Sequence, residues 1–214
     1  MAPPPYRLVI GNKNTSSWSL RPWLAMKRSA IPFEEVAIDL YMPDTKAQIL
    51  AHTPSGKVPA LEVLKTDGFT VWDSLAILEY LAEDYRDLWP QDRTARAVAR
   101  AVSAEMHSGF QALRETCSMD FLGRRPLGEF PAAATADIAR VVALWRNCRS
   151  RFGRTGPFLF GAFTAADAMY APVVSRFTTY VPDLARFGDD GAAAAYVAMM
   201  FDLPEMRQWG AGAR

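Results

Sequence analysis

Residues 14–23 have the sequence NTSSWSLRPW and lie between a short apolar run, Leu8–Ile10, and an apolar-rich stretch that continues to Met26. This order predicts a strand, then a polar loop, then the start of a helix. Four hydroxyl side chains crowd the loop at the place where a helix has unpaired N–H groups. Such a helix start can bind an anion, so this stretch is the first candidate for a functional site.

The position of the helix start decides what these serines can do. Proline lacks an N–H and fits best in the first turn of a helix, so Pro22 places the N-cap near Ser19. Ser16 and Ser17 then lie in the loop, where a hydroxyl can cap the helix or donate a hydrogen bond to an anion such as a thiolate. Serine clusters before helices are most often caps, so a catalytic role needs support from elsewhere in the chain.

The composition indicates a globular chain with a sizeable core and no dominant charge. The chain has 214 residues, 50% of them hydrophobic, and its net charge of +1 comes from interspersed acids and bases. Because there is no basic stripe and no polybasic tail, we expect neither a nucleic acid nor a membrane surface as a partner. No apolar run is long enough to span a bilayer and no signal sequence is recognisable, so we expect a cytoplasmic protein.

Cysteine and histidine are too few and too scattered for a conventional metal site. Cys117 and Cys148 follow neither a metal nor a CxxC spacing, and His52 and His107 form no cluster, so we expect no metal. The cysteines are expected to be buried small hydrophobes in a reducing compartment. Three aromatic residues are interpreted as packing: Trp72, Trp145 and Trp209.

Residues 1–85 alternate between strand and helix patterns. Strands are expected at Tyr6–Ile10 and Phe33–Leu40, and the intervening helix, about Ser19–Ser29, predicts that they pair in parallel. A second pair, Leu61–Leu64 and Phe69–Trp72, carries the Asp-Gly signal of an antiparallel hairpin at Lys65–Gly68. Helices are also expected over about Thr45–Ala51 and from Asp73 or Ser74 to Tyr85.

Two points in this half are candidates for ligand contact. Pro59 directly precedes an apolar run, and a cis Val58–Pro59 bond would expose the backbone of Val58 at the start of the strand. Asp73 and Ser74 lie at a helix N-terminus, where they either cap the helix or face the ammonium or carboxylate of a ligand.

After a linker at residues 86–93 the strand patterns stop, and residues 94–214 are expected to be all helical. Thr164–Asp167 is a variant of the capping box, with Asp in place of the usual Glu or Gln. Helices are expected over Thr94–Phe121, Ala133–Phe152, about 164–179, Ala192–Phe201 and Pro204–Trp209.

Three short motifs in order point to one family. Residues 56–61, GKVPAL, are similar to the G-x-V-P-x-L cis-proline segment of cytosolic glutathione transferases, and residues 73–77, DSLAI, to the acid-Ser-x-A-I motif of that family. Residues 163–167, FTAAD, resemble its F-[ST]-x-A-D helix box. The chain therefore resembles this family over nearly its full length. The resemblance implies a thioredoxin-like glutathione-binding domain at residues 1–85 and an all-helical C-terminal domain at residues 94–214.

The resemblance also implies a ligand and a set of contacts. Glutathione is the expected co-substrate and a homodimer the expected assembly. Val58, held by Pro59, would offer its backbone N–H and C=O to the cysteinyl part of glutathione. Asp73 and Ser74 would hold the γ-glutamyl end, and Lys57 would lie near the glycyl carboxylate.

Residues 16–21, SSWSLR, resemble the S-S-C-S-x-R pattern of the zeta class, and the surrounding sequence is similar to a bacterial subgroup of the family. The match places Ser16 on the catalytic serine of that class, with Ser17 as the near alternative. Trp18 stands where zeta members and the cysteine-using beta class carry Cys, which is a departure from the pattern. Disulfide chemistry of the beta type is therefore not expected.

The expected activity is conjugation of the glutathione thiolate to a small hydrophobic electrophile, a reaction of detoxification, with Ser16 or Ser17 donating a hydrogen bond to the sulfur. One alternative is a glutathione-dependent isomerase or dehalogenase of a small acid, with Arg114 or Arg176 as an additional cation. Another is a non-catalytic dimeric interaction module on the same fold. The electrophile is expected to lie against the helix that begins at residue 94, at Met106, Phe110 and Leu113.

Overall fold

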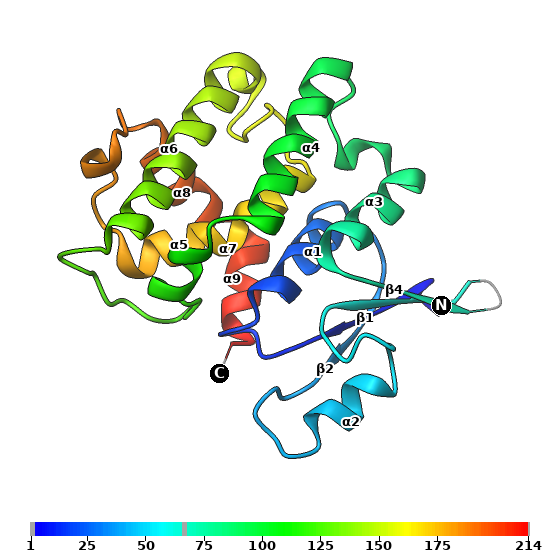
Figure 1. The fold of residues 1–214 in the computed structure, drawn as a ribbon. Helices are drawn as coiled ribbons and strands as arrows, with labels where there is room; N and C mark the ends of the chain where they lie inside the picture. The colour runs from blue at the N-terminus through cyan, green and yellow to red at the C-terminus, as the bar shows by residue number, and fades with distance from the viewer. Residues whose placement is uncertain (1–2, 66–67, 214) are drawn as a thin grey trace.

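The structure is a computed structural model that describes residues 3–65 and 68–213, and it sets a small mixed sheet beside a larger group of helices (Figure 1). The hairpin turn expected at Lys65–Gly68 lies partly outside the described residues. The N-terminal elements are β1 (Tyr6–Ile10), α1 (Ser17–Arg28), β2 (Glu34–Ala37), α2 (Thr45–Leu50), β3 (Ala60–Val63), β4 (Phe69–Trp72) and α3 (Ser74–Asp84).

The four strands form one sheet in the order β2-β1-β3-β4. β1 pairs in parallel with β2, with Val9 opposite Val36, and antiparallel with β3, with Leu8 opposite Leu61. β4 pairs antiparallel with β3. The expected parallel pair and the antiparallel hairpin are confirmed, and together with the flanking helices they form the thioredoxin-like arrangement.

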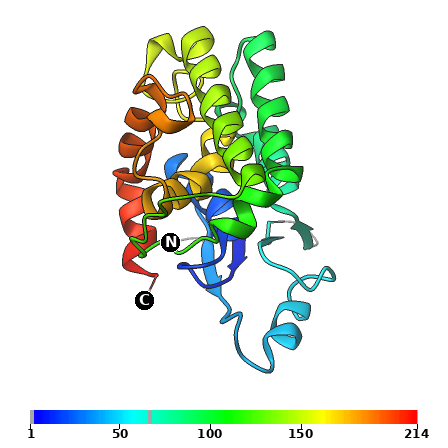
Figure 2. The same cartoon turned by 60° about the vertical axis from the view of Figure 1, so that its left-hand side comes forward.

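The helical elements after α3 form the second part of the molecule. Figure 2 shows these helices on one side of the sheet, with α2 projecting at the opposite end. The proposed division into residues 1–85, 86–93 and 94–214 stays a prediction. The elements are η1 (Arg86–Leu88), α4 (Arg93–Ser108), α5 (Gln111–Thr116), α6 (Ala132–Phe152), η2 (Gly153–Thr155), α7 (Ala165–Tyr180), η3 (Ala185–Phe187), α8 (Ala192–Phe201) and α9 (Pro204–Ala211).

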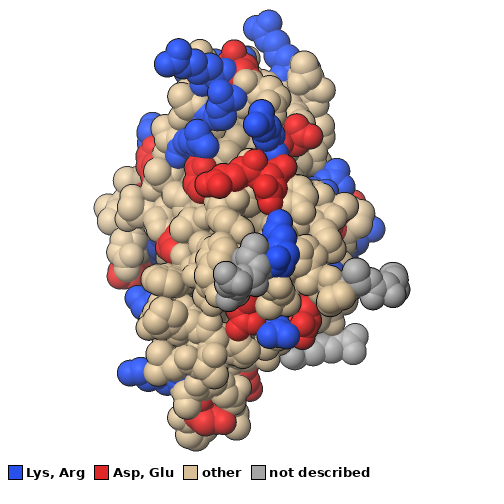
Figure 3. Space-filling view, turned by 90° about the vertical axis from the view of Figure 1, so that its right-hand side faces the viewer, with Lys and Arg blue, Asp and Glu red and all other residues tan. Residues whose placement is uncertain are grey.

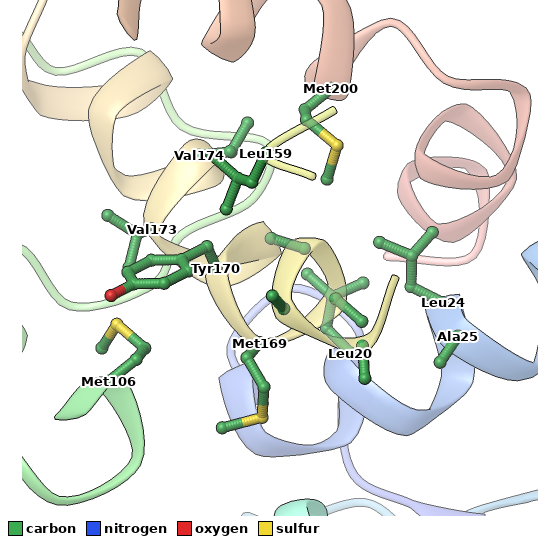
Figure 4. Close-up of a cluster of buried hydrophobic side chains, with 14 of the residues drawn as sticks. Leu20, Leu24, Ala25, Met106, Leu159, Met169, Tyr170, Val173, Val174 and Met200 are labelled. Atoms are coloured by element: carbon green, nitrogen blue, oxygen red, sulfur yellow. The ribbon is translucent and has the colours of Figure 1, made fainter. Parts of the chain in front are cut away.

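The contact between α1 and α7 joins the two parts of the core. Figure 4 shows Leu20 of α1 beside Met169 of α7, with Leu24 further along α1 and Val173 further along α7. All four are fully buried. Because α7 also contacts α4 and α8, the site at the start of α1 is held against the centre of the helical part.

The single helix expected over Thr94–Phe121 is wrong. α4 ends at Ser108, Phe110 adopts a left-handed conformation with φ of 60°, and α5 begins at Gln111. Side chains bond to the backbone on both sides of the break. Before it, the Gly109 carbonyl accepts a hydrogen bond from Nε of Arg114 at 3.0 Å. After it, the Leu113 N–H donates to the carboxylate of Asp137, a residue of α6, at 3.0 Å. The apolar residues of Thr94–Phe121 keep their helical spacing across the break, so this spacing does not reveal where α4 ends.

The first helix begins two residues earlier than expected. Ser16 is its N-cap residue, and the Ser16 carbonyl accepts the N–H of Leu20 at 3.3 Å. Pro22 therefore lies in the second turn, where it has no N–H to donate to the carbonyl of Trp18. Ser19 lies inside the helix, and its hydroxyl accepts the N–H of Gly11 at 3.1 Å.

Asp167 fixes the start of α7 and is fully buried. Its carboxylate accepts the N–H groups of Leu159 at 3.0 Å and Thr164 at 2.8 Å, and the hydroxyl of Tyr196 at 2.9 Å. The capping box expected at Thr164–Asp167 is confirmed. Burial raises the pKa of Asp167 to about 6, against the opposing effect of these donors.

The folded state therefore binds the Asp167 proton more tightly than the unfolded state does, since an exposed Asp has a pKa near 3.9. Its contribution to stability is fully present below pH 4 and is lost as the pH rises through 6. We expect the free energy of unfolding of the wild type, relative to Asp167→Asn, to fall by up to about 3 kcal/mol between pH 4 and pH 7. Urea unfolding at both pH values measures it, and a relative stability that rises with pH would contradict the account.

Candidate active site

A hollow of about 520 Å³ opens between the start of β3 and the N-terminus of α3, and we call it the central hollow. The five residues that the sequence assigned to glutathione all line it, from two separate segments. Trp18 borders it from the start of α1. The lining residues are Trp18, Ser55, Lys57, Val58, Pro59, Trp72, Asp73 and Ser74.

Val58 lines the central hollow directly before β3. The Val58–Pro59 peptide bond is cis, as expected, and strand pairing with β4 begins only at Ala60. Within residues 3–65 and 68–213, no hydrogen bond is found to the N–H or C=O of Val58. An extended peptide can therefore pair with Val58 in the manner of a strand added to a sheet edge.

Asp73 has two roles at the other side of the hollow. It is the N-cap of α3, and one carboxylate oxygen accepts the N–H groups of Leu75 at 2.9 Å and Ala76 at 3.2 Å. The other oxygen lies 3.1 Å from Nε2 of His107 on α4. Asp73 has a φ of 75°, a conformation that is costly for a residue other than glycine and that is frequent at functional sites.

Ser74 is backed by a buried arginine. Ser74 is the first residue of α3, and its hydroxyl oxygen accepts a hydrogen bond from Nη1 of Arg21 at 3.3 Å. Arg21 is fully buried, and its Nε donates to the carbonyl of Met169 on α7 at 3.2 Å. Burial lowers the pKa of Arg21 well below its usual value, and the nearby charges of Arg114 and Arg176 add to this effect.

Trp18 covers this arginine and faces the hollow. The guanidinium of Arg21 lies 4.3 Å from the Trp18 ring centroid, and that of Arg114 lies 4.9 Å from it. The ring of His107 packs edge-on against Trp18 at 5.3 Å. Trp18 thus connects the start of α1 with α4 and α5, a role that no periodic pattern in the sequence could reveal.

Sequence reasoning missed three residues of the hollow, namely Trp18, Ser55 and Trp72. The interpretation of Trp72 as packing is wrong, because its side chain is 46% exposed and lines the hollow. Trp145 and Trp209 are fully buried, so the same interpretation is confirmed for them. The signal that could have found Trp72 is its place next to Asp73 at the end of an edge strand.

Ser16 and Ser17 directly precede Trp18 in the chain, and neither is among the described residues that line the hollow. Each is 7% exposed. The hydroxyl of Ser16 donates to the hydroxyl oxygen of Ser19 at 2.7 Å, in the interior. For the hydroxyl of Ser17, no hydrogen-bond partner is found in the part of the chain that the structure covers.

The three residues expected to form the electrophile pocket are part of the hydrophobic core. Met106, Phe110 and Leu113 are all buried, and Figure 4 shows Met106 beside the ring of Tyr170. These side chains belong to the helical core and are not among the described residues that line the central hollow, so their role in an electrophile pocket stays a prediction. Their apolar periodicity is that of a packed helix face.

Other kinds of site find little support. The described residues include no group of three His, Cys, Asp or Glu that could hold a metal ion. No helix built from them is long and apolar enough to cross a membrane. On the face shown in Figure 3, Lys and Arg are interspersed with Asp and Glu, and neither sign dominates.

Known proteins resemble the chain in both parts. The family model "Glutathione S-transferase, N-terminal domain" matches residues 15–84, and the corresponding C-terminal model matches residues 96–204. A "Maleylacetoacetate isomerase" of Rattus norvegicus is 31% identical over 82% of this chain and 79% of its own length. A "Probable maleylacetoacetate isomerase" of Caenorhabditis elegans is 35% identical over 54% of this chain and 53% of its own, so that match spans about half of the relative.

A solved structure supports the same fold. The glutathione transferase homolog from Burkholderia gl BGR1, determined with bound glutathione, superposes with a TM-score of 0.69 at 23% identity and covers 98% of each chain. Three findings indicate the same family: the two domain models, the relative that matches most of the chain, and the fold with a four-stranded sheet beside a helical part. This chain belongs to the glutathione S-transferase family.

Proposed function

We propose that this chain is a glutathione transferase that binds glutathione in the central hollow and joins its sulfur to an electrophilic carbon of a small hydrophobic substrate. The observation that carries the proposal is the convergence of Lys57, Val58, Asp73 and Ser74 on one hollow at the start of α1. Family membership supports it, since these are the residues that the resemblance assigns to glutathione.

The chemistry of the hollow complements each part of glutathione. The free backbone of Val58 pairs with the cysteinyl residue, as a strand would. Asp73 attracts the γ-glutamyl ammonium, while the hydroxyl of Ser74 and the N–H groups at the start of α3 receive the γ-glutamyl carboxylate. The exposed Lys57 provides a positive charge for the glycyl carboxylate.

Activation of the thiol requires moderate stabilisation of the thiolate. A free thiol has a pKa near 8.5, and lowering it by about two units requires about 2.7 kcal/mol. A hydrogen bond from one hydroxyl to the anion provides about 1.5–3 kcal/mol, and the N-terminus of α1 adds about 0.3–1 kcal/mol. The proton leaves to solvent, the sulfur lone pair forms the carbon–sulfur bond, and the leaving group departs with its bonding electrons.

Ser16 is the proposed hydroxyl, and Ser19 is its present hydrogen-bond partner. In the structure the Ser16 hydroxyl donates its proton to Ser19, so it must turn from Ser19 to the sulfur when glutathione binds. The Ser19 oxygen keeps the Gly11 N–H as a donor after this change. Ser17 remains the alternative, since its hydroxyl has no partner among the residues described.

We expect Ser16→Ala to raise the pKa of bound glutathione by one to two units, about 1.4–2.7 kcal/mol. Turnover of a halogenated aromatic at pH 7 should fall about 10- to 100-fold as a result. The ultraviolet absorption of the thiolate measures the pKa, and Ser17→Ala, with the neighbouring hydroxyl removed, is the matched control. If Ser17→Ala abolishes both signals while Ser16→Ala changes neither, the assignment to Ser16 is wrong.

A second candidate is glutathione-dependent isomerisation of a small unsaturated acid. Two observations favour it: the names of the rat and worm relatives, and the cations beside Trp18, where Arg114 is in contact with the ring. In this reaction the thiolate adds to a conjugated double bond, the resulting single bond rotates, and elimination returns the thiolate and the isomerised acid. Glutathione is then regenerated rather than consumed.

The fate of glutathione separates the two reactions. With a cis-unsaturated keto acid, an isomerase gives many turnovers per glutathione, whereas a conjugating enzyme consumes one glutathione per product. If isomerisation is the function, Arg114→Met should lower that turnover about tenfold or more and leave conjugation of an uncharged aromatic within about twofold. Arg114→Lys is the control that keeps the charge, and equal losses in both assays would contradict a carboxylate-binding role for Arg114.

The proposed oligomeric state and cellular location rest on the family resemblance and not on contacts within the single chain. We propose a cytoplasmic homodimer, which sedimentation of the purified protein would test. A non-catalytic interaction module on this fold would bind glutathione weakly or not at all. The intact set of Val58, Asp73 and Ser74 favours the enzyme.

A further inference from the structure

Arg21 is a buried cation that lacks a carboxylate partner. Its side chain is fully buried, yet no ion pair to it is found in the described parts of the chain. Nε and Nη1 have neutral partners, the Met169 carbonyl and the Ser74 hydroxyl, and Nη2 has none. A buried charge without a counter-charge is costly, so a feature of this kind needs an explanation.

The surroundings increase the excess of positive charge. Burial is the main cause that lowers the pKa of Arg21; the charges of Arg114 and Arg176 add to it, and the charge of Asp73 opposes it. The Asp73 carboxylate contacts the N–H groups of α3 and His107, and it forms no ion pair with Arg21 among the described residues. The guanidinium of Arg21 contacts two residues that line the central hollow, Ser74 and Trp18, and none of the described carboxylates pairs with it.

We propose that Arg21 is a positioning residue for the γ-glutamyl carboxylate of glutathione, and this inference rests on the proposed glutathione site. Arg21 donates to the Ser74 oxygen, so the single proton of the Ser74 hydroxyl is directed into the hollow toward the carboxylate. The carboxylate in turn supplies the missing counter-charge, at one hydroxyl's distance from the guanidinium. Arg21 itself does not touch the ligand.

The order of groups along the chain fits an α-amino acid. The γ-glutamyl end carries its ammonium and its carboxylate on one carbon, and Asp73 and Ser74 are adjacent residues with the matching acceptor and donor. Lys57, the proposed partner of the other carboxylate, lies on a different segment of the hollow. Loss of Arg21 should therefore weaken recognition of one carboxylate and leave the rest of the tripeptide bound.

Calorimetry with three ligands tests this. Glutathione carries both groups, 4-aminobutyryl-Cys-Gly lacks only the γ-glutamyl carboxylate, and glutaryl-Cys-Gly lacks only the ammonium. We expect Arg21→Met to weaken glutathione and the glutaryl ligand at least tenfold and to leave the 4-aminobutyryl ligand within twofold. Arg21→Lys, which keeps the charge, should recover part of the loss. Equal weakening of all three ligands, or no change in any, would overturn the proposal.

Two further measurements keep the test decisive if Arg21→Met does not fold. The wild type should bind glutathione at least tenfold more tightly than the 4-aminobutyryl ligand, and Ser74→Ala should abolish most of that preference. A wild type that binds both ligands equally overturns the role of Arg21 whatever its variants do. A wild type that binds none of the three contradicts the glutathione site itself, which distinguishes failure of the proposed function from failure of this inference.

Discussion

The buried guanidinium of Arg21 is the contact on which the rest of the site depends. From α1 it reaches the first residue of α3 and a backbone carbonyl of α7, so one side chain connects both parts of the molecule. α1 also packs against α7 through buried apolar side chains, and the hydrogen bond from Arg21 ties α1 to Ser74. Because Trp18 lies over the same guanidinium, the wall of the hollow is set by the same group.

Much of this arrangement could be predicted from the sequence because it depends on local chemistry. An acid before an apolar helix predicted the cap at Asp73. Thr164–Asp167 predicted the start of α7 in the same way. At both helix starts, the residues that define the sequence motif are the ones that form the capping hydrogen bonds. The motif therefore predicts the contact directly. The proline before an apolar run only allowed a cis bond at Val58–Pro59, which the resemblance to the family's cis-proline segment then implied.

The parts that could not be predicted depend on contacts between distant segments. The break after α4 is held in part by Asp137, 24 residues away from Leu113, and the apolar stripe continues across it. That stripe marks the core, so Met106, Phe110 and Leu113 could not be told from pocket residues by periodicity. The position of Trp18 depends on its contacts with Arg21, Arg114 and His107. The sequence of the loop around Trp18 does not indicate the contacts with Arg114 and His107, which come from other helices.

The central claim is that the hollow between β3 and α3 binds glutathione with its sulfur at the start of α1. A crystal structure of the protein with glutathione tests this most directly. The account predicts strand-like pairing with Val58, the γ-glutamyl end at Asp73 and Ser74, and the sulfur within hydrogen-bond distance of Ser16 or Ser17. Glutathione bound with its sulfur away from α1, or no binding at millimolar concentration, would contradict it.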